Sequence, residues 1–391
     1  MIKTQSFTIN QPTKIIFGNN SVKQLGNVVA QLGGSRVFLI ADPGLQKAGI
    51  VQNITEILTS SKIPFTLYDK VTPEPGLKLA DAGFTLAKKN KADCVIGVGG
   101  GSALDIAKAV SILLTNGGKA EDYLGLGKIK LQGVPKIMIP TTAGTGAEVT
   151  FTAVFINEKT NSKGGMNGDP LYPDAAILDP ALTLSLPPSV TAATGIDAFT
   201  HALEAFVSTQ ANAISDMYAL EAMDLISRNL VIAYANSANL EARSAMLLGS
   251  LLGGKALATA GVGLVHAMAY PLGGMFNTAH GLANAVLLPY VVEYNIIGNP
   301  EKFTTIAQIM GYDTDGLPIR NAAELAVEAI HQLNADVGIP GTLSALNIPA
   351  DKIPEMAKIA LTVTRPVENN PRKPTLEEVI AVYEAAFDGP C

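Results

Sequence analysis

The chain has 391 residues, of which 48% are hydrophobic and 16% are charged, a composition typical of folded globular proteins. A chain of this length usually forms two domains, because single hydrophobic cores stop growing well below it. The formal net charge is −6 and the sequence contains no basic run, which argues against nucleic acid and anionic membranes as partners.

The first half of the chain alternates strand and helix signals. Apolar runs predict buried strands at residues 14–18, 36–42, 65–71, 94–101 and 136–142. Helical spacing separates them, as in KLADAGFTLAKKN and in LDIAKAVSILLTN. This alternation predicts an α/β domain over residues 1–185, with a parallel sheet flanked by helices.

The pattern changes near residue 185. The segment LDPALTLSLPPS holds a proline pair and is typical of a linker. Beyond it strand signals almost vanish, and helical spacing is found at residues 192–209, 214–234, 240–252, 305–310, 322–336 and 376–387. We therefore expect an all-α domain over residues 186–391, with the chemistry in the cleft between the two domains.

Three features bear on the location of the protein. The N-terminus, MIKTQSFTIN, lacks an apolar signal core, and the two cysteines, Cys94 and Cys391, do not form a disulfide framework. Leu257–Phe276 carries no Asp, Glu, Lys or Arg, but its glycines and Pro271 favour a buried helical pair over a membrane span. These features predict a cytoplasmic protein without a membrane partner.

A glycine-rich turn, VGGGSALD at residues 98–105, follows a predicted strand and opens a predicted helix. Gly99, Gly100 and Gly101 would let a ligand approach the backbone, and amides at a helix N-terminus bind phosphate. The turn lacks the G-x-G-x-x-G pattern, because Ser102 stands where the last glycine would be. The alternative is an ordinary turn, in which Ser102 and Asp105 form a capping box.

A second loop, TTAGTGAE at residues 141–148, follows the next predicted buried strand. Its small and hydroxyl-bearing residues suit a loop around a polar ligand, although a flexible turn would have the same composition. Asp42 ends an earlier strand, where a carboxylate would bind a ribose hydroxyl and repel the 2′-phosphate of NADP. An N-cap role for Asp42 before Pro43 is the alternative. Together the two loops and Asp42 predict a dinucleotide site that prefers NAD.

Three of the four histidines lie in apolar, small-residue surroundings. Asp197 and His201 are four residues apart, so on a helix they share a face. His266 and His280 follow, and the four side chains form a nitrogen and oxygen ligand set suited to Fe²⁺ or Zn²⁺. The alternatives are that each histidine is a satisfied core residue, and that Asp197 completes a helix cap begun by Thr194.

Four segments resemble the iron-dependent (group III) alcohol dehydrogenases: GGGSALDIAK, PTTAGTGAEVT, GIDAFTHALEAF and GLVHAMAYPLGGMFNTAHGLANAVLLPY. The resemblance spans essentially the whole chain, and the order and spacing of the four candidate ligands match the metal site of that family. The family includes lactaldehyde reductase and 1,3-propanediol dehydrogenase. It implies a dinucleotide domain, a helical metal domain, NAD(H), Fe²⁺ with Zn²⁺ as the alternative ion, and a homodimer or an assembly of dimers.

The resemblance also implies which residues contact the cofactor. The matching positions are in the two loops, at the strand end and at one lysine: Asp42, Gly99, Gly100, Gly101, Ser102, Asp105, Thr141, Thr142, Thr145 and Lys163. Lys163 is the member of this set that lies outside the segments discussed above.

The chain departs from the family at three places. Tyr270 stands where an H-x-M-x-H pattern would have a second histidine that serves proton transfer, so its hydroxyl becomes the candidate proton donor. Glu74 replaces the asparagine of a Pro-Asn-Pro turn. Lys255 stands in a usually apolar helix, two residues before Leu257.

The predicted activity is metal-dependent, NAD(H)-linked interconversion of alcohols and aldehydes. Phe151, Leu257 and Val262 are candidate pocket residues, and such an apolar pocket favours small primary alcohols, diols and aldehydes. If Lys255 or Arg365 reaches the pocket, the substrate is instead an anionic aldehyde, such as a semialdehyde acid or a sulfo- or phosphono-aldehyde. A lysine that extends to solvent is the simpler interpretation. An NAD- and metal-using lyase resembling dehydroquinate synthase and a non-catalytic scaffold are the alternatives from other classes.

Overall fold

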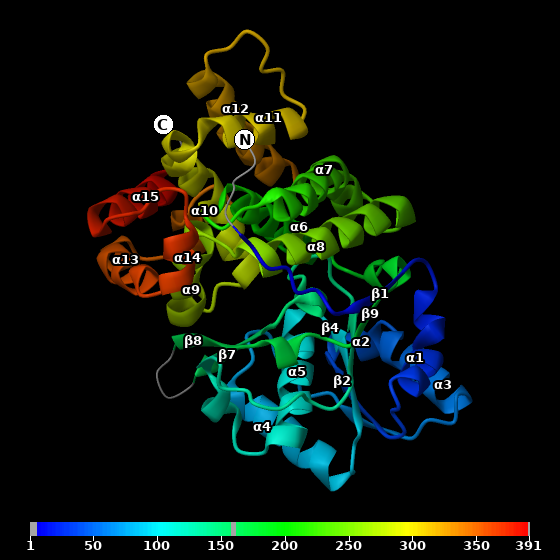
Figure 1. Cartoon of the computed structure of the whole chain (residues 1–391). Coiled ribbons are helices and arrows are strands. Elements are labelled where there is room, and N and C mark those ends of the chain that lie inside the picture. The colour runs from blue at the N-terminus through cyan, green and yellow to red at the C-terminus, as the bar shows by residue number, and fades with distance from the viewer. Residues whose placement is uncertain (1–5, 158–161, 390–391) are drawn as a thin grey trace. The chain divides into compact units, whose positions relative to one another are not determined.

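The computed structural model describes residues 6–157 and 162–389 (Figure 1). The chain divides into two compact units. One comprises residues 11–142 and 146–185, and the other comprises residues 6–10, 143–145 and 186–389. The first unit is α/β and the second is helical, which confirms the predicted fold class.

Six parallel strands form the main sheet of the α/β unit, in the order β1-β9-β6-β4-β2-β3. Their bounds are Lys14–Phe17 (β1), Val37–Ala41 (β2), Phe65–Tyr68 (β3), Cys94–Gly99 (β4), Lys136–Pro140 (β6) and Ala175–Leu178 (β9). Five of these strands fall within the ranges predicted from the sequence, and β9 does not.

A second, three-stranded sheet in this unit has the order β5-β8-β7. Its strands are Gly125–Leu126 (β5), Thr152–Asn157 (β7) and Ser162–Asn167 (β8). The sequence did not predict them, because β5 has only two residues and β8 reads SKGGMN, without an apolar run.

Helices cover both faces of the main sheet (Figure 1). They are α1 (Leu25–Gln31), α2 (Gly44–Lys47), α3 (Ile50–Ser60), α4 (Leu77–Lys89) and α5 (Gly101–Asn116). Strand β2 shows how its sequence produces this arrangement. Phe38 and Ile40 pack into a core that includes α4 and α5, whereas Val37 and Leu39 pack into a core that includes α1 and α3. Because both faces are buried, the strand is apolar throughout.

The order of the strands reverses between β2 and β4. From β2 the chain adds β3 on one side and then crosses back to add β4 on the other. Ligands of open α/β sheets bind outside the carboxyl ends of the strands at such a reversal. Here Asp42 follows β2, and the glycine turn follows β4.

The helical unit is built around α6. Its helices are α6 (Pro188–Val207), α7 (Ala213–Ala235), α8 (Leu240–Ala260), α9 (Leu264–Phe276), α10 (His280–Asn295), α11 (Pro300–Ile309), α12 (Ile319–Asp336), α13 (Ile353–Leu361), α14 (Thr364–Asn369) and α15 (Leu376–Asp388). Residues 195–207 of α6 are all buried, and α6 packs against α7, α8 and α10. Burying an ionisable side chain costs free energy unless that side chain has a partner. The ionisable side chains of the buried helix α6 therefore indicate a functional site.

The uncharged stretch Leu257–Phe276 covers the end of α8 and the whole of α9. Among the described residues, no single helix is long and apolar enough to cross a membrane. Helices α8 and α9 pass that test only as a pair, and the pair bends by 104° at the break between them.

Candidate dinucleotide and metal sites

The glycine turn connects β4 to α5. Gly99 has a φ of +147°, and a Cβ placed on it would lie 2.8 Å from the Cβ of Ala103, so only glycine suits this position. The N-cap of α5 is Gly100, and no side chain caps that end. The alternative interpretation, a capping box formed by Ser102 and Asp105, is therefore wrong. The amides of the first turn of this sixteen-residue helix are suited to binding an anion instead.

Three strand ends meet around this turn. A Cβ on Gly99 would lie 3.6 Å from the Cβ of Asp42, which follows β2. A Cβ on Gly100 would lie 3.5 Å from the Thr142 hydroxyl, and the Thr141 amide donates a 3.0 Å hydrogen bond to the Gly99 carbonyl. The structure thus brings Asp42, the glycine turn and the start of the second loop together at the strand reversal.

Asp42 also has a local structural task. Its Oδ1 atom accepts a 2.8 Å hydrogen bond from the Gly44 amide, at the start of α2. The N-cap of α2 is Pro43, one residue later than the alternative interpretation assumed. A carboxylate has two oxygens, so this bond leaves acceptor capacity for a ribose hydroxyl.

Lys163 and Asp105, two further predicted cofactor residues, are held in ion pairs. The Lys163 Nζ atom lies 2.6 Å from Oε2 of Glu74, which has a φ of +51°. Asp105 lies 3.9 Å from the Lys108 ammonium and accepts a 2.9 Å hydrogen bond from the Val154 amide. Burial raises the pKa of Asp105 to about 6, against the opposing effect of Lys108. The glutamate that departs from the family pattern is thus the partner of Lys163.

Two buried ionisable side chains, Glu148 and Lys108, lie in the same unit and were not singled out from the sequence. Glu148, in the short turn Ala147–Val149, is 2% exposed, and its Oε1 atom has no hydrogen-bond partner. Burial raises the pKa of Glu148 to about 7. The Lys108 ammonium donates to the Thr150 hydroxyl (3.2 Å) and the Thr152 carbonyl (2.8 Å), and burial lowers its pKa to about 8.

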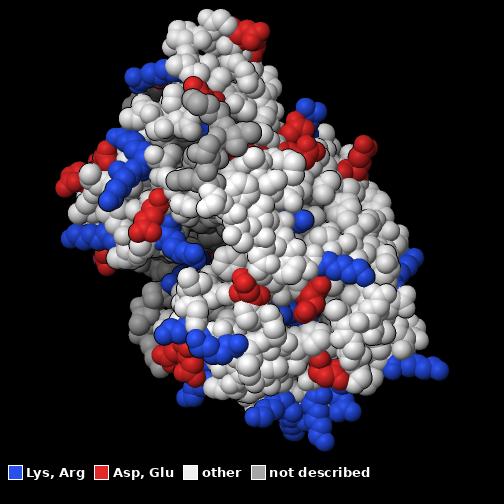
Figure 2. Space-filling model, in the orientation of Figure 1, with Lys and Arg blue, Asp and Glu red and all other residues white. Residues whose placement is uncertain are grey.

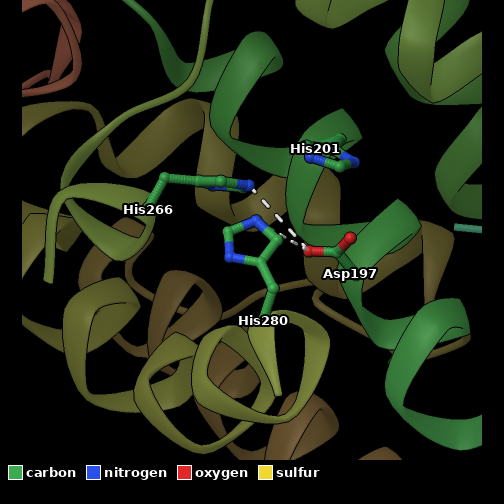
Figure 3. A group of neighbouring side chains, drawn as sticks. All are labelled: Asp197, His201, His266 and His280. Atoms are coloured by element: carbon green, nitrogen blue, oxygen red, sulfur yellow. Dashed lines mark ion pairs between the residues drawn. The ribbon is translucent and has the colours of Figure 1, made fainter. Parts of the chain in front are cut away.

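The four predicted metal ligands converge in the helical unit (Figure 3). Asp197 and His201 lie on α6, His266 on α9, and His280 at the start of α10. One ligand atom from each lies within 4.8 Å of every other, and the Nε2 atoms of His266 and His280 are each 3.9 Å from Oδ1 of Asp197. The first three are buried and His280 is partly exposed. Three imidazoles and one carboxylate are a donor set that fits a divalent transition-metal ion.

The position of Asp197 follows from its helix. Helix α6 begins at Pro188, so Asp197 lies well inside it, and the alternative of a helix cap begun by Thr194 is wrong. The Thr194 hydroxyl donates instead to the Val190 carbonyl, 2.9 Å away. The four-residue spacing to His201 directs both ligands to one face of the buried helix.

The surroundings favour the unprotonated ligand forms that a cation needs. Burial lowers the pKa of His201, although Asp197 opposes this effect. Burial alone would raise the pKa of Asp197, but the nearby imidazoles and Asn284 hold it below its usual value. The Nδ1 atom of His201 lies 3.3 Å from the Gly144 carbonyl, which fixes the proton on Nδ1 and leaves Nε2 to bind. Gly144 and the predicted cofactor residue Thr145 group with the helical unit.

Two residues of this site were missed in the sequence. Glu204 on α6 is buried, and its Oε2 atom lies 2.5 Å from Nδ1 of His266. Asn284 on α10 is fully buried, with Nδ2 at 2.6 Å from Oδ1 of Asp197 and at 3.2 Å and 3.3 Å from Nε2 of His266 and His280. Each follows a candidate ligand by three or four residues on the same helix, which is the signal that could have found them.

Two departures from the family pattern also lie in the helical unit. The Tyr270 ring centroid is 6.4 Å from that of His280, so the tyrosine adjoins the ligand group. The Lys255 ammonium lies 5.3 Å from the centroid of the Tyr218 ring on α7, and burial lowers its pKa. Lys255 therefore stacks on an aromatic neighbour while it is partly exposed.

The candidate pocket residues are distributed over both units. Phe151 is partly exposed in the α/β unit, where its ring packs at 5.5 Å from that of Tyr172. Leu257 and Val262 are partly exposed at the end of α8 and in the turn before α9. All three have apolar surface available to a ligand.

Comparisons with known proteins match nearly the whole length of the chain to one family. Residues 12–180 match the iron-containing alcohol dehydrogenase family, and residues 191–387 match the C-terminal part of the Fe-containing alcohol dehydrogenase family. Long-chain-alcohol dehydrogenase 1 of Geobacillus thermodenitrificans is 44% identical over 376 residues, which are 95% of this chain and 94% of that protein. Sulfoacetaldehyde reductase of Bilophila wadsworthia is 38% identical over 377 residues, or 96% and 97%. A crystal structure of 1,3-propanediol oxidoreductase matches with a TM-score of 0.96 at 39% identity, covering 98% of this chain and 100% of that one.

A dinucleotide fold with its ligand loops at the strand reversal, together with a helical unit that carries a nitrogen and oxygen ligand set, defines a class of metal-dependent, nicotinamide-linked oxidoreductases. The chain belongs to the iron-containing alcohol dehydrogenase family, as the sequence resemblance indicated. It is therefore an oxidoreductase of an iron-containing family.

Proposed function

We propose that the chain interconverts small primary alcohols or diols and their aldehydes, with Asp197, His201, His266 and His280 as the ligands of its iron. The convergence of these four side chains, with ligand atoms within 4.8 Å of one another, carries the proposal. When bound, the ion supplies a Lewis acid that stabilises negative charge on the substrate oxygen.

The α/β unit binds the dinucleotide in this proposal. Asp42 accepts from the ribose, and the amides at the start of α5 bind the pyrophosphate. The residues assigned to cofactor contact are the turn and loop residues and the paired lysine: Gly99, Gly100, Gly101, Ser102, Asp105, Thr141, Thr142, Thr145 and Lys163. The nicotinamide takes up or releases the hydride, and the protein supplies binding and orientation.

Tyr270 is the proposed proton donor and acceptor for the substrate oxygen. Its ring adjoins His280, and its phenol is the titratable group that replaces the histidine of the family pattern. Phe151, Leu257 and Val262 are proposed as the apolar lining that favours small uncharged substrates.

A second candidate substrate class is an anionic aldehyde. It is supported by the 38% identity to a protein named sulfoacetaldehyde reductase and by the partly buried ammonium of Lys255. The stacking of Lys255 on Tyr218 gives the ammonium another role, so we rank this class second.

The test is NADH oxidation by the purified chain loaded with Fe²⁺, against neutral and anionic short aldehydes, with Zn²⁺-loaded and metal-free controls. Metal-dependent turnover of neutral aldehydes is the expected result. Faster turnover of the anionic members would establish the second class instead. If no aldehyde oxidised NADH with either ion, a lyase that returns NAD unchanged would become the better explanation.

We also propose that the protein is a homodimer. The helical unit exposes Phe7, Ile9, Met217 and Ile232, and Figure 2 shows a broad area over α7 and α8 with few charged side chains. Exposed apolar surface of this kind is typical of subunit interfaces. Light scattering on the eluted protein should give twice the 40.7 kDa chain mass, and a monomeric mass at micromolar concentration would contradict the proposal.

A cytoplasmic location is proposed on the thiol chemistry of the chain. Cys94 is a buried free thiol and takes part in no disulfide, as in proteins of reducing compartments. Cys391 lies outside the described residues. Fractionation of cells that express the chain is the test, and recovery with exported proteins would contradict it.

A further inference from the structure

The carboxylate of Glu204 is enclosed between α6 and the start of α9. It is 3% exposed. Its Oε1 atom accepts a 2.6 Å hydrogen bond from the Val265 amide, in the first turn of α9. Its Oε2 atom lies 2.5 Å from Nδ1 of His266, the next residue. A Cβ on Gly263 would lie 3.1 Å from Oε1, so the helix start approaches the carboxylate as closely as its backbone allows.

These two contacts fix which nitrogen of His266 carries the proton. The Val265 amide is a donor only, so Oε1 is committed to it. An ionised carboxylate can only accept, so the Oε2 contact requires a proton on Nδ1 of His266. The Nε2 atom then keeps its lone pair, and it is this atom that lies 3.9 Å from Oδ1 of Asp197. The 3.2 Å contact from the Asn284 amide nitrogen to Nε2 agrees with an unprotonated Nε2.

We propose that Glu204 is a positioning residue that makes His266 a metal ligand. One carboxylate sets the tautomer of the imidazole and also anchors the helix end from which that imidazole projects. This inference rests on the proposed metal site and names a residue outside the four ligands. The resemblance of the sequence to its family did not single out this position.

The chemistry of the contact predicts that an amide cannot replace the carboxylate. Glutamine offers one acceptor oxygen to two donors, the Val265 amide and Nδ1–H of His266. If its oxygen faces Val265, its NH₂ group faces Nδ1 and drives the imidazole proton to Nε2, which blocks metal binding. If its oxygen faces His266, two N–H groups oppose each other at Val265 in a buried site.

The first measurement follows metal affinity in the full-length chain. Co²⁺, a spectroscopic substitute for Fe²⁺, is titrated in competition with a chromophoric chelator. Loss of a hydrogen-bonding partner of a ligating histidine typically costs about 10- to 100-fold in metal affinity, and we expect that loss for Glu204→Gln.

Asn370→Ala is the matched control. The Oδ1 atom of Asn370 accepts from the Leu264 amide at 3.3 Å, so this change loosens the same helix start without touching His266. We expect it to lower the thermal unfolding temperature and to leave Co²⁺ affinity within about threefold of the parent value. An equal loss of Co²⁺ affinity in both variants would mean that Glu204 only stabilises the start of α9, and it would overturn the proposal.

The second measurement reads the tautomer and needs no metal. The chain has four histidines, so ¹⁵N-histidine labelling gives a spectrum of four imidazoles, and His266→Gln assigns the signal of interest. The parent chain should show His266 protonated at Nδ1, and Glu204→Gln should move the proton to Nε2. An Nε2-protonated His266 in the metal-free parent chain would overturn the proposal even if the glutamine variant failed to fold. If the parent chain bound no Co²⁺, the metal site itself would fail, and the tautomer result would still judge the role of Glu204.

Discussion

Replacing Gly281 with alanine tests whether the spacing of α6 and α10 sets the metal site. Gly281 follows the proposed ligand His280 in the first turn of α10. A Cβ at this position would lie 2.4 Å from the carbonyl oxygen and 2.9 Å from the carbonyl carbon of Ala193, and 3.4 Å from the Cβ of Asp197. The obstacle is the backbone of α6, which cannot rotate away as a side chain could.

The size of the effect follows from this overlap. Ordinary contact begins at 3.4 Å, so the two helices must separate by about 1.0 Å (3.4 less 2.4) to accommodate the methyl group. His280 moves with α10 while Asp197 and His201 stay on α6. Metal sites tolerate deviations of about 0.2 Å in ligand distance, so we expect metal affinity to fall at least tenfold. Overpacking of this kind also costs about 1–3 kcal/mol of unfolding free energy.

Chelator competition with Co²⁺ measures the affinity, and thermal unfolding of the metal-free chain measures the stability. The matched control is Gly341→Ala, because a Cβ on Gly341 would meet nothing within 4 Å and its φ is not in the left-handed region. The control should bind Co²⁺ like the parent chain. If Gly281→Ala also kept the parent affinity, the ligands would not depend on this helix contact and the reasoning would be refuted.

Four further changes address the other assignments. Tyr270→Phe should lower kcat about 100-fold with little change in KM, because general acid–base groups contribute at least that much, and a loss below threefold would remove Tyr270 from the proton route. Asp42→Ala should reduce the preference for NADH over NADPH by about tenfold or more in kcat/KM, because the carboxylate no longer repels a 2′-phosphate. An unchanged ratio would mean that Asp42 does not contact the cofactor and serves only to accept the hydrogen bond from Gly44. Lys255→Ala should leave kcat/KM for neutral aldehydes within about threefold, and a selective loss with sulfoacetaldehyde would promote the second substrate class. Glu148 has a pKa of about 7 when folded against an ordinary 4.5, so the unfolded chain gives up this proton first and stability falls as pH rises from 4.5 through 7. Glu148→Gln has no group at this position that titrates in this range, so its unfolding free energy should not show this fall as the pH rises. Thermal or urea unfolding should find the variant more stable than the parent at pH 8, by on the order of 2–3 kcal/mol, and no more stable at pH 4.5. Parallel pH profiles of the two proteins would refute this prediction.

The sequence predicts the main sheet well because its strands are buried on both faces. Continuous apolar runs such as RVFLIAD need no knowledge of neighbours to be recognised. The strand β9 reads AAIL beside a proline-rich linker, and β8 reads SKGGMN. These segments become strands through pairing with distant partners, such as β9 with β1 and β6, and that information is not local.

The candidate site likewise has residues that the sequence predicts and residues that it does not. Helical spacing named Asp197 and His201, the scarcity and apolar surroundings of the histidines named His266 and His280, and the structure brings all four together. Their binding of iron stays a prediction. Glu204 was missed because its partner is 62 residues away, and a buried carboxylate looks no different in sequence from an exposed one. The family resemblance supplied the cofactor positions that local chemistry could not distinguish from ordinary turns.

The four proposed ligand side chains come from three separate helices, α6, α9 and α10. An ion held there is a cross-link between segments up to 83 residues apart in the chain, from Asp197 to His280 (280 less 197), and it binds only when those segments are folded against one another. By mass action, free ion at 100 times its dissociation constant adds about 2.7 kcal/mol to the unfolding free energy. If these residues hold the iron, the folded fraction of the helical unit depends on the iron supply of its surroundings, and scarcity of the metal would reduce the amount of folded protein as well as its activity.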